Sequence, residues 1–328
     1  MTGLIDVHAH LLFDELLGHA GDIGPRLEHD TAGNATLVTG GYSFGIGKSA
    51  TTNRNARQRL DALDEADITV QVVSGSPLWY FPHHDAETVR PFARRYNDLM
   101  AEWTQNAPDR LKALAVLPVQ DTAASVSELE RAVGELGFLG ACIGTDARSD
   151  LDDPGLDDLY SACEQLDVPL FIHSVVAGVD GPPGDARLRR WLRDVTIGYP
   201  FEETVAVTSL VLGGVLERHP RLDICLSHGG GAIPFLLGRV RDWVATGTAP
   251  IDVEQFDRDY ARLWFDTHLH SALSTQLLTQ VASPDRLVFG TNFGGWDSAA
   301  SHEADDTPID LSANARRLLR LPESDLPV

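Results

Sequence analysis

The feature that most restricts the fold of this chain is the regular alternation of short apolar segments with longer amphipathic ones. Each short segment has the pattern of a buried strand, and nearly all of them are followed by a helical pattern. Strands that alternate with helices pair in parallel through right-handed crossovers. Counted from Leu4, the sequence predicts eight strands, at residues 4–7, 68–73, 112–117, 140–144, 169–173, 222–228, 263–266 and 286–290.

Eight strand–helix repeats predict an α/β fold of one kind, the closed (β/α)8 TIM barrel, whose active site lies at the C-terminal ends of the strands. The 328 residues and 43% hydrophobic content suffice for one large core, and we expect a single barrel domain over residues 1–328. Residues 13–50 are rich in glycine and show no clear period. We expect this stretch to be an irregular insertion that forms a flap over the active site.

Composition excludes several classes of function. The formal net charge of −22 opposes binding to nucleic acid or to an anionic membrane surface. No apolar run approaches the length of a membrane span, and the first residues enter a strand without a basic region or cleavage site, so we expect a cytoplasmic protein. Cys142, Cys163 and Cys225 lie in apolar segments and do not pair by spacing, which indicates buried free thiols.

Histidines follow several of the predicted strands. His8 and His10 lie two residues apart at the end of the first strand, so their side chains point the same way. His173 ends the fifth strand and His228 the sixth, and Asn292 follows the eighth. Because strand ends meet on one face of a barrel, these side chains predict a metal centre, and imidazole suits zinc, manganese or iron.

The chain resembles the amidohydrolase superfamily, in particular the branch around aminocarboxymuconate-semialdehyde decarboxylase and the aromatic acid decarboxylases. The resemblance covers nearly the whole chain in order and is weakest in the flap and after Trp296. Its most specific motif is His-Gly-Gly-Gly-x-x-Pro-Phe, which begins at His228. The matching stretches are residues 6–10, 169–173, 213–220, 227–239 and 289–293.

The resemblance implies roles for the strand-end residues. His8, His10 and His173 correspond to ligands of one divalent metal ion, for which we expect zinc, with manganese as the alternative. His228 corresponds to the general acid/base near the metal; a fourth ligand is the other interpretation. Asn292 stands where the family has an aspartate ligand, so it is both a candidate ligand and a candidate catalytic residue.

The resemblance also implies substrate contacts. Arg59 and Arg239 correspond to arginines that bind substrate carboxylates, and Arg239 is expected to reach the neighbouring subunit of a homodimer. Trp191 corresponds to a tryptophan that lines the pocket. The alternative for Arg59 is a solvated helix face, and the alternative for Arg239 is a surface ion pair with a nearby acidic residue.

Asparagine at position 292 offers a carbonyl oxygen but no charge and no base. Three interpretations follow. The histidines hold the metal without it, or the chemistry differs from that of the relatives and leaves His228 as the proton carrier, or the asparagine is an engineered replacement of aspartate. Asp297, five residues further on, is a candidate substitute for the absent carboxylate.

We therefore predict a metal-dependent, non-oxidative decarboxylase that acts on an aromatic or conjugated carboxylic acid, a small molecule, with His228 as general acid/base. The alternatives are a metal-dependent hydrolase of amide, ester or C–C bonds, or a hydratase, on the same scaffold. A barrel that binds a ligand without turnover is a further alternative, and it depends on Asn292 alone.

Overall fold

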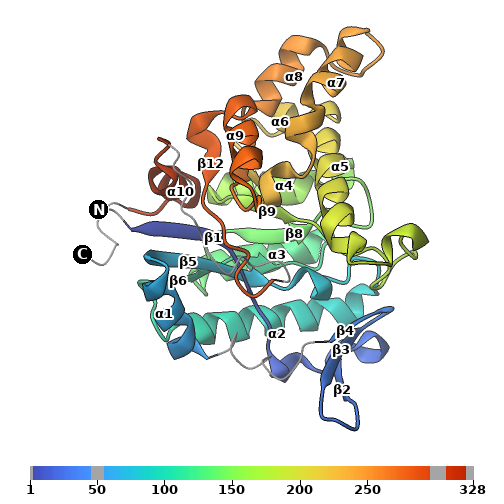
Figure 1. The fold of residues 1–328 in the computed structure, drawn as a ribbon, viewed down its shortest axis with the longest axis vertical. Coiled ribbons are helices and arrows are strands. Elements are labelled where there is room, and N and C mark those ends of the chain that lie inside the picture. Colours follow the sequence, from blue (N-terminus) through green and yellow to red (C-terminus); the bar gives the residue numbers. More distant parts are fainter. Residues whose placement is uncertain (1–2, 46–54, 296–307, 323–328) are drawn as a thin grey trace.

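The computed structural model describes residues 3–45, 55–295 and 308–322. It shows a barrel of parallel strands with helices around it (Figure 1). Going around the barrel, the strands are β1 (Leu4–Leu11), β5 (Ile68–Gly75), β6 (Leu111–Ala113) with β7 (Ala115–Val116), β8 (Ala141–Gly144), β9 (Leu170–His173), β10 (Ile224–Leu226), β11 (Trp264–Asp266) and β12 (Leu287–Val288).

Backbone hydrogen bonds close the barrel between its first and last strands. The amide of Val7 donates to the carbonyl of Phe289 (2.9 Å), and the amide of His10 donates to the carbonyl of Phe293 (2.7 Å). The third barrel position is split into β6 and β7 at Leu114, whose amide bonds to Val73 on β5 (2.9 Å). The predicted eight-position barrel is therefore confirmed.

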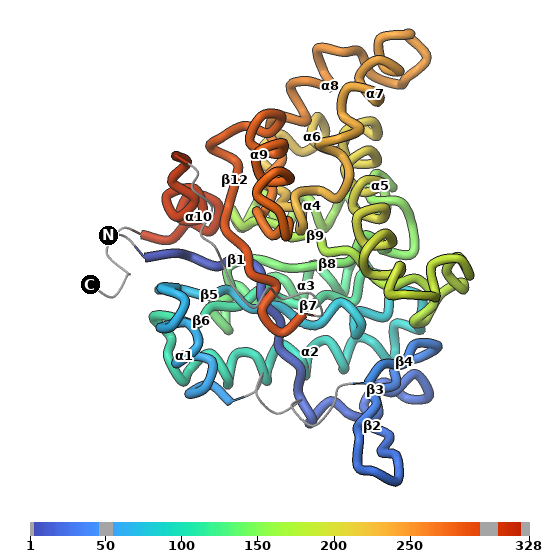
Figure 2. Tube along the Cα trace, in the orientation of Figure 1, coloured from blue at the N-terminus to red at the C-terminus, as the bar shows by residue number. Residues whose placement is uncertain are grey.

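Helices cover the outside of the barrel, and Figure 2 shows how the chain winds from one strand through a helix to the next. Aspartate or asparagine side chains cap several of them; Asn55, for example, accepts from two amides of the first turn of α1. The helices are α1 (Ala56–Glu65), α2 (Ala86–Thr104), α3 (Thr122–Gly134), α4 (Asp157–Leu166), α5 (Tyr199–Leu212), α6 (Val215–Arg218), α7 (Ile233–Ala245), α8 (Val253–Tyr260), α9 (Ala272–Val281) and α10 (Leu311–Leu319).

Strand β1 explains how the barrel carries a polar site. Ile5, Val7, Ala9 and Leu11 alternate with Asp6, His8 and His10, and all of them are buried. One face of the strand packs on the surrounding helices, and the other face points into the barrel, where the polar side chains find partners. A strand buried on both faces reads as an apolar run in which the few polar residues stand out.

The inserted segment differs from the expectation. Instead of being irregular, its described part forms an antiparallel sheet of β2 (Arg26–His29), β3 (Ala35–Thr39) and β4 (Tyr42–Gly45). The strands are short and the outer two are largely exposed, so they lack the apolar alternation that marks a strand in sequence. Residues 46–50 of the predicted flap lie outside the described residues.

Other element boundaries also differ. Helix α5 ends at Leu212, and Gly214 takes a left-handed conformation (φ 70°) before the short α6 begins. The strand predicted over 222–228 ends at Leu226, and a 3₁₀ turn, Ser227–Gly230, follows it. Helix α8 was not predicted.

No helix in the described ranges combines the length and the apolarity that a bilayer crossing demands.

Candidate metal centre and active site

Four histidines meet at the C-terminal end of the barrel. His8 and His10 come from β1, His173 from the end of β9, and His228 from the turn after β10. All four are buried, and the ring centroid of His8 lies 4.9 Å from that of His173 and 5.1 Å from that of His228. The candidate ligand atoms of His8, His173 and His228 all lie within 4.8 Å of one another.

Two of these histidines contact buried carboxylates. Nδ1 of His8 lies 2.6 Å from Oδ2 of Asp266 at the end of β11, and Nδ1 of His228 lies 2.5 Å from Oε1 of Glu203 on α5. An ionised carboxylate only accepts hydrogen bonds, so Nδ1 is the donor in both pairs. The lone pair of each neutral ring is therefore on Nε2.

The other two histidines contact backbone carbonyls. Nδ1 of His173 lies 2.7 Å from the carbonyl of Ser174, and Nδ1 of His10 lies 3.2 Å from the carbonyl of Gly75. A carbonyl also only accepts, so Nδ1 of His173 carries the hydrogen. Nδ1 of His10 also lies 3.1 Å from the hydroxyl of Ser74, which can donate or accept, so these contacts serve either tautomer of that ring. The rings of His8, His173 and His228 are thus held in the same tautomer, with Nε2 as the atom able to bind a metal.

This set of donors fits a divalent cation. Nε2 of His10 and Nε2 of His173 lie only 3.2 Å apart, a separation that suits either a hydrogen bond from Nε2 of His10 to Nε2 of His173 or two lone pairs that share one cation. Burial and the neighbouring histidines hold the pKa of His173 well below its usual value of 6.5, so this ring keeps its lone pair. The cluster is therefore suited to a metal such as zinc or manganese.

Asn292 lies in the same cluster. Its side chain is buried, its backbone is left-handed (φ 51°), and Nδ2 lies 3.5 Å from Nε2 of His228. Its place after β12 is that expected from the sequence. Asp297, the candidate substitute for a carboxylate here, lies outside the described residues.

A buried network beneath the cluster fixes the first strand. The carboxylate of Asp6 accepts hydrogen bonds from the amide of His8 (3.1 Å), from Nε2 of Gln71 (2.7 Å) and from the hydroxyl of Thr291 (2.7 Å). Asp6 is fully buried, and this burial raises the pKa of its carboxyl to about 6. The network joins β1 to β5 and to the segment that carries Asn292.

Arg59 belongs to this network. Its guanidinium donates to Oε1 of Gln71 (2.7 Å) and to the carbonyl of His10 (3.0 Å), and it lies over the ring of Phe293 at 4.0 Å. The side chain is fully buried, and burial lowers the pKa of the guanidinium to about 9. Arg59 is therefore not on a solvated helix face, and in this arrangement it supports the strand of His10.

The other two predicted substrate contacts lie at the surface. Arg239 is exposed on α7. The side chain of Trp191 is 69% exposed, and the guanidinium groups of Arg190 and Arg193 each lie 4.4 Å from its ring centroid. In the single chain, neither residue is among those that line the cavity beside His228.

A cavity of about 550 Å³ opens beside the histidine cluster. Its lining is mostly apolar, which suits an aromatic or conjugated ring. His228 and His268 contribute the polar edge, and the ring centroids of these two residues lie 5.6 Å apart. Tyr199, Phe235, Leu269 and Leu277 are among the residues that supply the rest.

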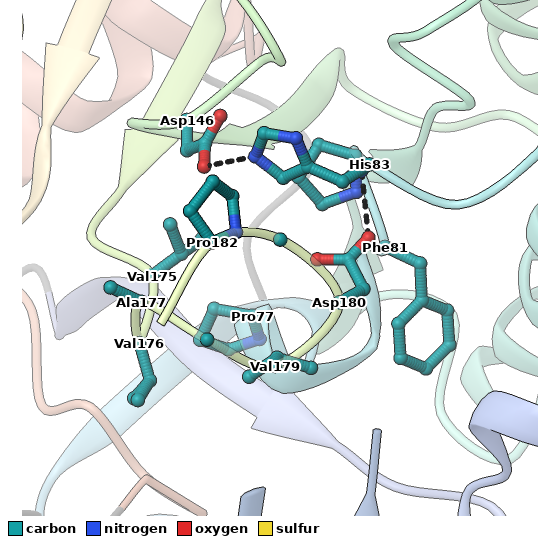
Figure 3. Close-up of a pocket in the computed structure, with 13 residues that line it drawn as sticks. Pro77, Phe81, His83, Asp146, Val175, Val176, Ala177, Val179, Asp180 and Pro182 are labelled. Carbon is teal, nitrogen blue, oxygen red and sulfur yellow. Dashed lines mark hydrogen bonds and ion pairs between the residues drawn. The ribbon is translucent and has the colours of Figure 1, made fainter. Parts of the chain in front are cut away.

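The loop after His173 is anchored at a smaller cavity of about 40 Å³ (Figure 3). The carboxylate of Asp180 accepts from the amides of His83 (2.7 Å) and His84 (3.1 Å). Nε2 of His83 lies 2.6 Å from Oδ2 of Asp146. The pair His83–His84 therefore holds this loop in place.

Sequence reasoning missed three residues of the site. Glu203 was overlooked because Glu202 and Glu203 are adjacent on a helix, and nothing in the sequence tells which of them faces His228. Asp266 carried a usable signal, since it is a polar residue at a strand end, like the histidines. His268, two residues further on, is likewise buried and lies against His228.

Comparison with curated proteins gives relatives that span most of the chain. It is 29% identical over 303 residues to 2-amino-3-carboxymuconate-6-semialdehyde decarboxylase from Dictyostelium discoideum, a match that covers 88% of this chain and 81% of the relative. It is 31% identical over 292 residues to gamma-resorcylate decarboxylase from a Rhizobium species, covering 80% and 86%. Both relatives are named as decarboxylases.

A solved structure gives the same fold. The dihydroxybenzoic acid decarboxylase from a Polaromonas species, determined with bound manganese and the inhibitor 2-nitroresorcinol, superposes with a TM-score of 0.75. The match covers 98% of both chains at 23% sequence identity, so it supports the fold alone. The model of the amidohydrolase family matches residues 5–321. This chain belongs to the amidohydrolase family.

Proposed function

We propose that this protein is a metal-dependent carboxy-lyase that removes carbon dioxide from an aromatic or conjugated carboxylic acid without an oxidant. One observation carries the proposal. His228, held by the carboxylate of Glu203 at 2.5 Å, lies in the same buried cluster as the other histidines and borders the largely apolar cavity. A proton carrier, a cation site and space for a ring therefore adjoin one another.

In the proposed reaction the His228 imidazolium donates a proton to the ring carbon that bears the carboxyl group. The bond between that carbon and the carboxyl carbon then breaks, its electron pair returns to the ring, and carbon dioxide leaves. A bound divalent cation would orient the substrate's oxygen atoms and offset their negative charge. Glu203 stabilises the imidazolium through Nδ1, and water restores the proton to Nε2.

We propose His8, His10 and His173 as the ligands of that cation, with the side chain of Asn292 as a weak further ligand or none. Zinc is the metal we propose, because it favours imidazole nitrogen at about 2.0–2.1 Å; manganese, bound in the structural neighbour, is the alternative. His228 also lies within ligand distance of His8 and His173, so a fourth-ligand role competes with proton transfer. Metal content of His228→Gln separates them, because only a ligand role predicts loss of the metal.

We propose a homodimer as the working form. Large apolar side chains are exposed on the segment before α5, on α5 and α7, and on α9, and α7 packs against α5 and α9. A second copy would cover them, bring Trp191 into an enclosed setting and allow Arg239 of the partner subunit to approach a substrate carboxylate. The exposed residues are Trp191, Leu192, Ile197, Phe201, Val205, Phe235, Trp243 and Leu273.

Phe235 gives the direct test of the dimer, because it is 80% exposed and also lines the cavity. Phe235→Glu should shift the mass in solution from dimer to monomer and lower turnover.

We further propose that residues 1–328 act as one barrel unit in the cytoplasm. The three cysteines, all buried free thiols, suit a reducing compartment.

The test of the proposed reaction is release of carbon dioxide from a panel of aromatic acids, headed by gamma-resorcylate, after zinc or manganese has been restored. Run in heavy water, the reaction should place deuterium on the carbon that lost the carboxyl group. His228→Gln should abolish this incorporation while the fold persists. Hydrolase or hydratase activity would instead appear as water added to the product, and a panel in which no acid loses carbon dioxide would contradict the proposal.

A further inference from the structure

The candidate ligands of the cation carry no negative charge: His8, His10, His173 and Asn292 are all neutral side chains. A divalent cation buried among neutral groups is costly unless negative charge lies nearby. Among the described residues, the carboxylates in contact with cluster histidines are those of Asp266 and Glu203.

These two carboxylates are held in different ways. Oε1 of Glu203 accepts from Nδ1 of His228 and from the hydroxyl of Ser227, both at 2.5 Å, so it serves the proposed proton carrier. Asp266 serves His8: Oδ2 lies 2.6 Å from Nδ1 of that ring, and Oδ1 accepts from the amide of His268 (3.1 Å). Both oxygens of Asp266 are engaged, which fixes the carboxylate toward His8.

We propose that Asp266 is the positioning residue that supplies the anionic charge of the cation site, acting through the imidazole of His8. A carboxylate that accepts from Nδ1 pushes electron density toward Nε2 and makes that atom a stronger ligand. It also holds the ring in the orientation that directs Nε2 into the cluster. The negative charge that an aspartate at position 292 would place on the cation is thereby delivered from β11, the strand that pairs with β12, which Asn292 follows.

Two neighbouring groups fix this arrangement. The backbone amide of His8 is bonded to Asp6, so the residue is tethered at its backbone as well as at its ring. Asp266 ends β11, which pairs with β10 and β12 in the barrel sheet. Both members of the pair are thus carried by barrel strands, and their side chains are 5% and 2% exposed.

The experiment measures affinity for zinc and for manganese in metal-free protein, by competition with a chromogenic chelator. Asp266→Asn keeps the size of the side chain and removes its charge, and we expect the dissociation constant to rise about 10- to 100-fold. Adding Asn292→Asp in the same chain returns a carboxylate to the cluster and should restore most of that loss. If Asp266 did not act through its charge, Asp266→Asn would change the affinity by the same factor with and without Asn292→Asp.

The matched control is Asp259→Asn. Asp259 is also a buried aspartate, 1% exposed, but it pairs with Arg258 and Arg262 away from the cluster. We expect this variant to lose stability and to keep the affinity of the parent protein. Circular dichroism of every metal-free variant establishes that the chains compared are folded.

The inference rests on the proposed cation site, and the outcomes separate the two. If the parent protein binds neither metal, the proposed metal centre itself is wrong. If the parent binds one equivalent and folded Asp266→Asn binds it equally well, the metal centre stands and only the role of Asp266 is overturned. Loss of affinity that the added Asn292→Asp does not restore likewise contradicts a charge role.

Discussion

His8 and His228 each place Nδ1 against a buried carboxylate, but the chain holds the two pairs differently. His8 and Asp266 both lie on barrel strands. His228 lies in a turn with a left-handed backbone (φ 47°), and its partner Glu203 projects from a helix outside the barrel. The difference indicates that the cation half of the site, His8, His10 and His173, is held by barrel strands. The proton half, His228 and Glu203, depends instead on how α5 packs against the glycine turn, residues 227–231.

This comparison predicts that each half can be removed without the other. His173→Ala should remove the cation, with metal content falling from one equivalent to near zero and turnover by about 10³-fold or more. The measurement is metal analysis of the purified protein together with carbon dioxide release. His84→Ala is the matched control, because His84 lies in a loop outside the cluster and should keep both.

Glu203→Gln should impair proton transfer by His228 and leave the cation half intact. It keeps the shape of the side chain but removes the charge that stabilises the His228 imidazolium, and we expect kcat to fall about 10²-fold. KM and metal content should change little, since His8, His10 and His173, the proposed ligands, make their Nδ1 contacts elsewhere. Glu202→Gln, a neighbour that lines a different cavity, should leave kcat as it was. Equal losses in the two variants would assign the effect to α5 in general.

A substitution in the glycine turn should also impair the proton half, because this turn carries His228. Gly231 has a positive φ of 68°, and a Cβ there would lie 2.1 Å from the carbonyl oxygen of Pro200. Gly231→Ala should therefore cost about 1–3 kcal/mol in the free energy of unfolding and lower kcat, because the turn carries His228. Gly238→Ala, in the exposed part of α7 with open space around it, should not destabilise. Chemical denaturation and kinetics of both variants provide the measurement.

In the metal-free protein, lowering the pH should reduce the free energy of unfolding, because of a histidine in the cation half. Burial lowers the pKa of His173 well below 6.5, so the unfolded chain binds a proton near pH 6.5 that the folded chain refuses. Stability should thus be fully present above that pH and should fall below it, by about 1.4 kcal/mol per pH unit for one group. Urea denaturation at several pH values measures the slope, and bound metal should not remove it, because a metal-bound imidazole in the folded chain also takes no proton. A slope of opposite sign would contradict the burial of a neutral cluster.

The sequence sufficed for the parts of the site that lie on strands. His8, His10 and His173 were found because parallel strands in a barrel bring their C-terminal ends to one face, so position along the chain translates into position in space. Asn292 was found in the same way. The barrel itself followed from the alternation of apolar and amphipathic segments.

The parts that depend on helices escaped prediction. The rotation of α5 decides that Glu203 and not Glu202 meets His228, and this rotation is set by packing. For Arg59, the alternative of a solvated helix face is wrong, because the side chain is buried against Gln71 and the carbonyl of His10. Its contact with a substrate carboxylate stays a prediction. A buried arginine in an amphipathic helix gives no signal in sequence, because it reads as one more polar position.

We expect the histidine cluster to bind one divalent cation. Anomalous diffraction at the zinc absorption edge, from crystals grown with zinc, is the direct test. We expect one strong peak per chain, about 2.0–2.1 Å from Nε2 of His8 and of His173. A fully zinc-loaded crystal in which that position shows no peak, with the metal instead at His83 and Asp146 or elsewhere, would contradict it.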